Sequence, residues 1–86
     1  MAWQLRIAKQ AAKKLARVPR KDRERIAVAL AEMRESPFRG DIARLKNESA
    51  AWRRRVGNYR IFFDVEMDEL CVDVTDVRRR TTTTYG

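Results

Sequence analysis

Two different hydrophobic spacings, one in each half of the chain, most constrain what this sequence can fold into. In residues 59–65 every second side chain is apolar or aromatic, which predicts a strand whose apolar side faces a core. In the N-terminal half, Ile26, Leu30 and Met33 recur instead at the spacing of a helix. The combination predicts an α+β fold in which helices cover one face of a sheet.

Proline, glycine and asparagine residues divide the sequence into seven predicted elements. The order is a strand at residues 3–7, helices at 8–18 and 19–35, and strands at 42–45, 51–56, 59–65 and 70–77. Gly57 and Asn58 are expected to form the tight turn of a hairpin. We therefore predict a single α+β domain over residues 1–86, in which an N-terminal strand and a helical hairpin precede an antiparallel meander (β-α-α-β-β-β-β).

The spacing within each element also predicts the core. Strands are expected to contribute alternate residues, and helices to contribute alanines together with larger side chains. The predicted core residues are Trp3, Leu5, Ile7, Ala11, Ala12, Leu15, Ala16, Ile26, Ala27, Leu30, Ala31, Met33, Trp52, Val56, Tyr59, Ile61, Phe63, Val65, Leu70, Val72 and Val74.

The charge balance limits the classes of partner. Lysine and arginine number 20 against 12 acidic residues, which gives a net charge of +8. Such a charge attracts nucleic-acid phosphate, anionic lipid or an acidic protein. No apolar run approaches the ~20 residues of a membrane span, and no signal segment is visible. We therefore expect a cytoplasmic protein that does not associate with membranes.

The missing residue types limit the chemistry. The chain has one cysteine, Cys71, and no histidine. An intrachain disulfide is therefore impossible, a zinc site lacks ligands, and the usual general base is absent. We expect no metal and no cofactor, and Cys71 is interpreted as a small packing residue.

Strand alternation predicts an arginine-rich face on the side of the sheet away from the helices. Guanidinium groups bind phosphate with several hydrogen bonds, and a nearby aromatic ring can stack on a base. The pattern therefore favours RNA as a ligand, with an acidic protein partner as the alternative. Arg54 alternates toward the core instead, and we expect its charged end to reach water. The residues expected on this face or at its edge are Arg53, Arg55, Arg60, Phe62, Arg78, Arg79 and Arg80.

Residues 52–63, which read Trp-Arg-Arg-Arg-Val-Gly-Asn-Tyr-Arg-Ile-Phe-Phe, carry a family resemblance. Together with Leu45, the apolar strand from Leu70 and the arginine-rich end that closes on Tyr85, this stretch resembles the RelE toxins of toxin-antitoxin modules. The resemblance covers essentially the whole chain. It implies a RelE-like fold and a metal-independent, ribosome-dependent endoribonuclease, or mRNA interferase, that inhibits translation. It also implies an acidic, RelB-like antitoxin that joins the toxin in a hetero-oligomer.

The resemblance also implies which residues act. The catalytic set carries over to Arg53, Arg55, Arg60, Arg79 and Tyr85, with Arg78 or Arg80 as alternatives to Arg79. Residues expected to bind RNA are Arg54, Phe62, Arg78 and Arg80. One departure from the family pattern is that Arg53 and Arg55 stand where relatives often have lysine, which can serve as a base where arginine cannot.

The implied reaction is attack of a ribose 2′-hydroxyl on the adjacent phosphate. Arginines can stabilise the additional negative charge of the transition state, but they are poor bases at neutral pH. Tyr85 is expected to orient or deprotonate the hydroxyl, or to stack on a base. Two other functions stay open: a ParE-like inhibitor of DNA gyrase, and a non-catalytic relative that only binds ribosomes or nucleic acid.

Overall fold

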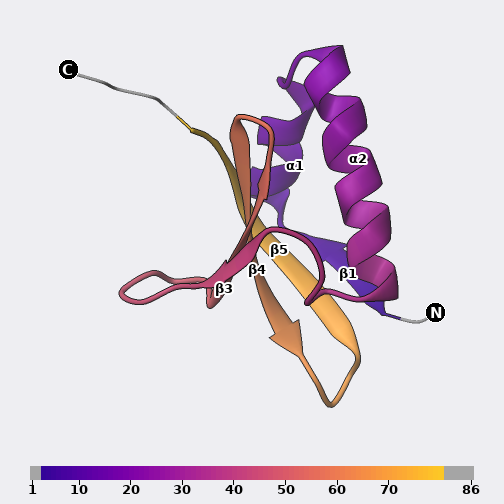
Figure 1. The fold of residues 1–86 in the computed structure, drawn as a ribbon, viewed down its shortest axis with the longest axis vertical. Helices are drawn as coiled ribbons and strands as arrows, with labels where there is room; N and C mark the ends of the chain where they lie inside the picture. The colour runs from indigo at the N-terminus through magenta and orange to yellow at the C-terminus, as the bar shows by residue number, and fades with distance from the viewer. Residues whose placement is uncertain (1–2, 81–86) are drawn as a thin grey trace.

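The computed structural model describes residues 3–80, which form seven elements in the predicted order. Five strands make one sheet in the order β1-β5-β4-β3-β2, with β1 parallel to β5 and the other neighbours antiparallel. Both helices lie on the same side of this sheet (Figure 1). The predicted α+β arrangement is confirmed. The elements are β1 (Gln4–Ile7), α1 (Lys9–Ala16), α2 (Arg20–Glu35), β2 (Ile42–Arg44), β3 (Trp52–Val56), β4 (Tyr59–Glu66) and β5 (Cys71–Arg79).

The core lies between the helices and one face of β4 and β5. Its sheet side includes Ile61, Phe63 and Val72, which are fully buried, and its helix side includes Ile26 and Met33. Because strand side chains alternate, the residues between these positions project from the other face. We call that side, which the helices do not cover, the open face. No helix within residues 3–80 is long and apolar enough to span a membrane.

Some predicted core positions are wrong at the ends of elements and around the helices. Leu70 is 50% exposed and lies in the turn before β5 with a φ of 51°. Ile7 ends the edge strand β1 and is 38% exposed. The buried stripe on the helices is narrower than predicted, and in α2 it includes Ala29. The alanines that are exposed instead are Ala12, Ala16, Ala27 and Ala31.

A β-bulge interrupts the pairing of β4 and β5. Phe62 pairs with Asp76 and Phe63 pairs with Val74, so Thr75 has no partner on β4. An extra residue in one strand reverses the side to which all later residues of that strand point. Val77 therefore returns to the core, where it is 2% exposed.

Arg54 is buried between the sheet and α2, contrary to the expectation that its charged end reaches water. Only 8% of the residue is exposed, and its guanidinium forms an ion pair with Glu32 and donates to the carbonyl of Ala29. The guanidinium also lies against Gly40, where an added Cβ would be 2.8 Å from Arg54 Cζ. Its Nε has no hydrogen-bond partner among residues 3–80. Arg54 therefore joins β3 to α2 and does not take part in the open face.

We predict that Arg54→Ala lowers the free energy of unfolding by about 2–4 kcal/mol, because it leaves a cavity between β3 and α2. Arg54→Met should cost less than about 1.5 kcal/mol, because Glu32 is more than half exposed and stays hydrated without its partner. Urea unfolding followed by circular dichroism measures both values. Equal losses for the two substitutions would contradict this account and indicate that the charge itself is essential.

Candidate nucleic-acid interface

Three arginines lie side by side across the open face. Arg55 of β3 pairs with Arg60 of β4, and Arg60 pairs in turn with Arg78 of β5. Adjacent strands are about 4.8 Å apart, so the three side chains start from neighbouring points of the sheet. We call these residues the arginine row. All three are exposed, and a row of guanidinium groups is suited to binding phosphate oxygens.

Arg53 shares the open face but is partly neutralised. Its Nη1 donates to the carbonyl oxygen of Asp41 at 3.2 Å and lies 3.3 Å from the Asp41 carboxylate. The same carbonyl accepts the backbone N–H of Arg55 at 2.9 Å. Arg53 therefore helps to hold the segment before β2 against β3, and it is less available to a phosphate than the arginine row.

Phe62 points toward the open face as predicted, but its ring is not exposed. The residue is 4% exposed, and the Arg78 guanidinium lies 4.3 Å from the ring centre. This cation–π contact stabilises Arg78 over the aromatic ring. The expectation that Phe62 offers a free stacking surface is wrong in this arrangement, because a base could reach the ring only if Arg78 moved.

Two carboxylates lie beside Arg78. Asp76 Oδ2 accepts a hydrogen bond from Arg78 Nε at 3.0 Å, and Glu48 of the β2–β3 loop is 3.8 Å from Arg78 Nη2. Asp76 also accepts from Lys14 Nζ of α1 at 2.7 Å. Partial burial opposes ionisation of Asp76, but hydrogen bonds from Lys14, Arg78 and the Val77 N–H outweigh it and lower its pKa. Asp76 thus stays charged at neutral pH and orients Arg78.

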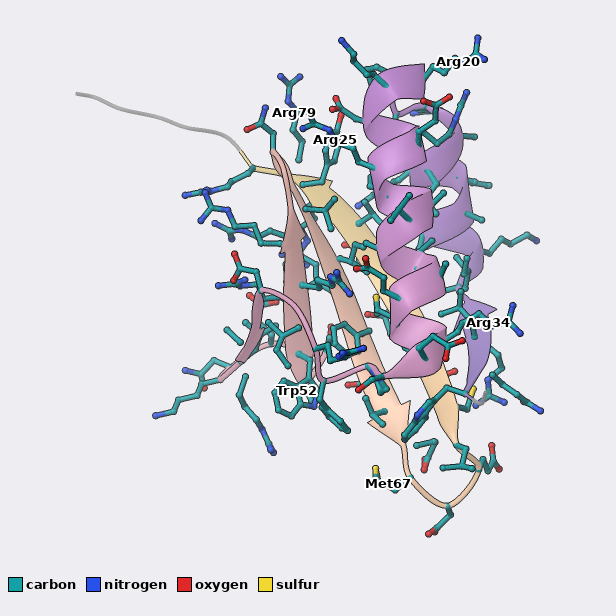
Figure 2. All side chains as sticks on the ribbon, turned by 45° about the vertical axis from the view of Figure 1, so that its right-hand side comes forward. Arg20, Arg25, Arg34, Trp52, Met67 and Arg79 are labelled. Carbon is teal, nitrogen blue, oxygen red and sulfur yellow. The ribbon has the colours of Figure 1, made fainter. Side chains whose placement is uncertain are left out.

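The β-bulge corrects the assignment of the C-terminal arginines. Arg79 pairs with Tyr59, a core residue, and lies on the side of the sheet that the helices cover. Figure 2 shows Arg79 at the same end of the molecule as Arg25 of α2. Arg78, and by alternation Arg80, point to the open face instead. Of the three C-terminal arginines, Arg78 is therefore the one that pairs with Arg60 on the open face, while Tyr85 lies outside the described residues.

The acidic neighbours of the arginines were not predicted. Asp41 and Glu48 lie in segments that flank β2, where strand alternation says nothing about direction. Asp76 lies just beyond the bulge, so alternation counted from Val74 places it on the wrong side. Two arginines of the open face, Arg53 and Arg78, are therefore oriented by carboxylates as well as by the sheet. Within residues 3–80, no three His, Cys, Asp or Glu side chains are grouped to hold a metal ion.

Comparisons with known proteins find the same fold and identify the family of the chain. A family model described as the ParE toxin of the type II toxin-antitoxin system, parDE, matches residues 5–83. The RelB–RelE complex from Methanococcus jannaschii contains a chain with 31% identity and a TM-score of 0.70, and the match covers 86% of this chain and 88% of that one. No curated protein sequence matches the chain.

Two further solved structures support the fold alone. The RelE–RelB complex from Pyrococcus horikoshii matches with a TM-score of 0.83 at 20% identity, covering 96% of this chain and 100% of that one. The isolated E. coli RelE toxin matches with a TM-score of 0.81 at 21% identity, covering 95% and 88%. With the family match over nearly the whole sequence, the chain belongs to the RelE/ParE superfamily and is the toxin of a type II toxin-antitoxin system.

Proposed function

We propose that this toxin is an endoribonuclease that cuts mRNA bound to the ribosome and thereby inhibits translation. The observation that carries the proposal is the arginine row, with three guanidinium groups on adjacent strands of the face that the helices leave free. Such a row suits a substrate with closely spaced phosphates, and RNA provides both the phosphates and the attacking 2′-hydroxyl.

The arginine row would act on the charge of the transition state. Attack of the 2′-hydroxyl oxygen on the adjacent phosphorus forms a 2′,3′-cyclic phosphate and breaks the bond from phosphorus to the 5′-oxygen of the next nucleotide. The 2′-hydroxyl loses its proton to water and the leaving 5′-oxygen takes one from water. Negative charge builds up on the phosphate oxygens between these two events, and positioned guanidinium groups stabilise that charge. Arg60 is central in the row, with Arg55 on one side and Arg78 on the other. Arg53, which is held by Asp41, would support Arg55 and bind phosphate more weakly.

Proton transfer is the step to which the side chains of the described residues contribute least. An arginine stays protonated at neutral pH and is therefore a poor base, and the chain has no histidine. We propose that Tyr85 orients the 2′-hydroxyl and that the ribosome aligns the mRNA for attack. This division of roles accounts for ribosome dependence, because the free protein would bind RNA without placing it for the reaction.

The proposed partners follow from the same charges. The ribosome and its mRNA supply phosphate to the open face, and an acidic RelB-like antitoxin would compete for it in a hetero-oligomer. Solved relatives include complexes of RelE toxins with RelB antitoxins. The net charge of +8 favours fast, salt-sensitive association with either partner.

A second candidate is inhibition of DNA gyrase. It is favoured by the family model, which is that of ParE toxins. A non-catalytic protein that only binds ribosomes or nucleic acid is the third. The reaction products distinguish the candidates, since a nuclease produces new mRNA ends and a gyrase poison produces trapped, cleaved DNA.

We predict that purified protein produces mRNA ends only when ribosomes are present, and that Arg60→Ala slows the cutting roughly a hundredfold or more. Primer extension on a translated mRNA measures the cuts. Arg20→Ala is the control, because it removes an exposed arginine on α2, which lies on the other side of the sheet. Undiminished cutting by a folded Arg60→Ala protein would show that the row is not the site. Cleaved DNA with gyrase, and no mRNA ends, would favour the second candidate.

The neighbours Arg78 and Arg79 provide a test of the bulge. Arg78→Ala should lower the cutting rate by at least about tenfold, since a charged hydrogen bond contributes about 1.5–3 kcal/mol. Arg79→Ala should leave the rate unchanged, because its side chain starts from the helix-covered side. The reverse result in the same ribosome assay would mean that the strand end has the opposite orientation when RNA is bound.

A further inference from the structure

A pocket opens on the helix-covered side of the sheet, away from the arginine row. It has a volume of about 420 Å³ and lies between the turn that joins the two helices and the ends of β4 and β5. Its floor is apolar, with Val18, Tyr59 and Val77 each less than one-tenth exposed. A volume of this size accommodates one or two large side chains.

Three basic residues surround the pocket: Lys14 and Arg17 from the end of α1, and Arg79 from the end of β5. Lys14 is neutralised by Asp76 at 2.7 Å. Within residues 3–80, neither Arg17 nor Arg79 forms an ion pair. Among the described residues these two positive charges have no counter-charge, which a bound ligand could supply beside the buried apolar floor.

The composition of the pocket decides between two kinds of anionic ligand. A nucleotide needs polar groups that read the edges of its base, but the floor is formed by two valines and the nearly buried Tyr59. A peptide with a large apolar side chain and flanking carboxylates needs an apolar centre and a charged rim. That is the usual anatomy of a protein interface, in which a buried anchor is surrounded by polar contacts.

We infer that this pocket is a docking site for an acidic segment of a partner protein that inserts one large apolar side chain between Val18, Tyr59 and Val77. Carboxylates on either side of that anchor pair with Arg17 and Arg79. The antitoxin of this toxin is the first partner to consider. The inference does not depend on nuclease activity, since it concerns the other side of the sheet.

The bulge in β5 makes the two surfaces neighbours in sequence but separate in space. Arg78 projects to the open face and Arg79 to the pocket, so consecutive residues serve different ligands. A partner bound in the pocket would cover the end of β5, from which Arg78 also projects. Because Arg78 and Arg79 lie on opposite sides of the sheet, substitutions in the pocket should weaken partner binding and leave the arginine row intact.

The test uses a synthetic peptide in which glutamates flank a single leucine, titrated into the isotope-labelled full chain. We expect amide shifts at Val18, Tyr59 and Val77 in nuclear magnetic resonance spectra. We also expect Arg17→Ala and Arg79→Ala each to weaken binding about tenfold, measured by fluorescence anisotropy of a labelled peptide. Replacing the leucine of the peptide by alanine should weaken binding by at least as much, because the anchor is lost.

Matched variants separate the pocket from general attraction between opposite charges. Arg20→Ala removes a nearby charge outside the pocket, and Arg60→Ala removes one from the row. Both should leave peptide affinity unchanged at physiological salt. The inference is overturned if the peptide does not bind, if shifts are confined to the open face, or if leucine and alanine peptides bind equally. Displacement of the peptide by adenosine monophosphate at the same amides would identify a nucleotide site instead.

Discussion

Burial of one face of β4 and β5 against the helices determines the register of the two strands and the side of the sheet on which each arginine lies. Ile61, Phe63, Val72 and Val74 are almost completely buried on that face. A shift of one residue in either strand would expose this apolar surface to water, at a cost of about 1.5–3 kcal/mol for each large side chain. The register is therefore strongly determined, and the positions of the arginines on the opposite face follow from it.

Residues that alternate with a well-defined core could be predicted from the sequence. Arg55 and Arg60 lie where the spacing of Tyr59, Ile61 and Phe63 places them, and the two-residue turn at Gly57 keeps their strands paired. For Arg54 the predicted direction, toward the core side, is correct, but the burial of its charged end could not be predicted. The sequence contains no local sign that Glu32, on a helix distant in sequence, would pair with it.

The end of β5 could not be predicted from alternation at all. Thr75 is an ordinary strand residue, and nothing in its neighbours marks the bulge that reverses the strand from that point. In the structure the bulge is accompanied by a hydrogen bond from the Thr75 hydroxyl to the Phe62 carbonyl at 3.3 Å. It also allows Val77 to complete the core. The assignment of Arg78 or Arg79 to the open face depends on this one unpaired residue.

Like charges placed directly opposite each other on neighbouring strands destabilise a sheet, so the arginine row opposes folding. The structure offsets part of this cost locally. Arg78 is stabilised by Phe62, Asp76 and Glu48, while Arg53 next to the row is neutralised by Asp41. Arg55 and Arg60 have no ion pair within the described residues. A bound phosphate would remove their mutual repulsion as well as form new hydrogen bonds. Anionic ligands of the open face should therefore stabilise the fold. Part of their binding free energy comes from relief of the repulsion between arginines in the free toxin.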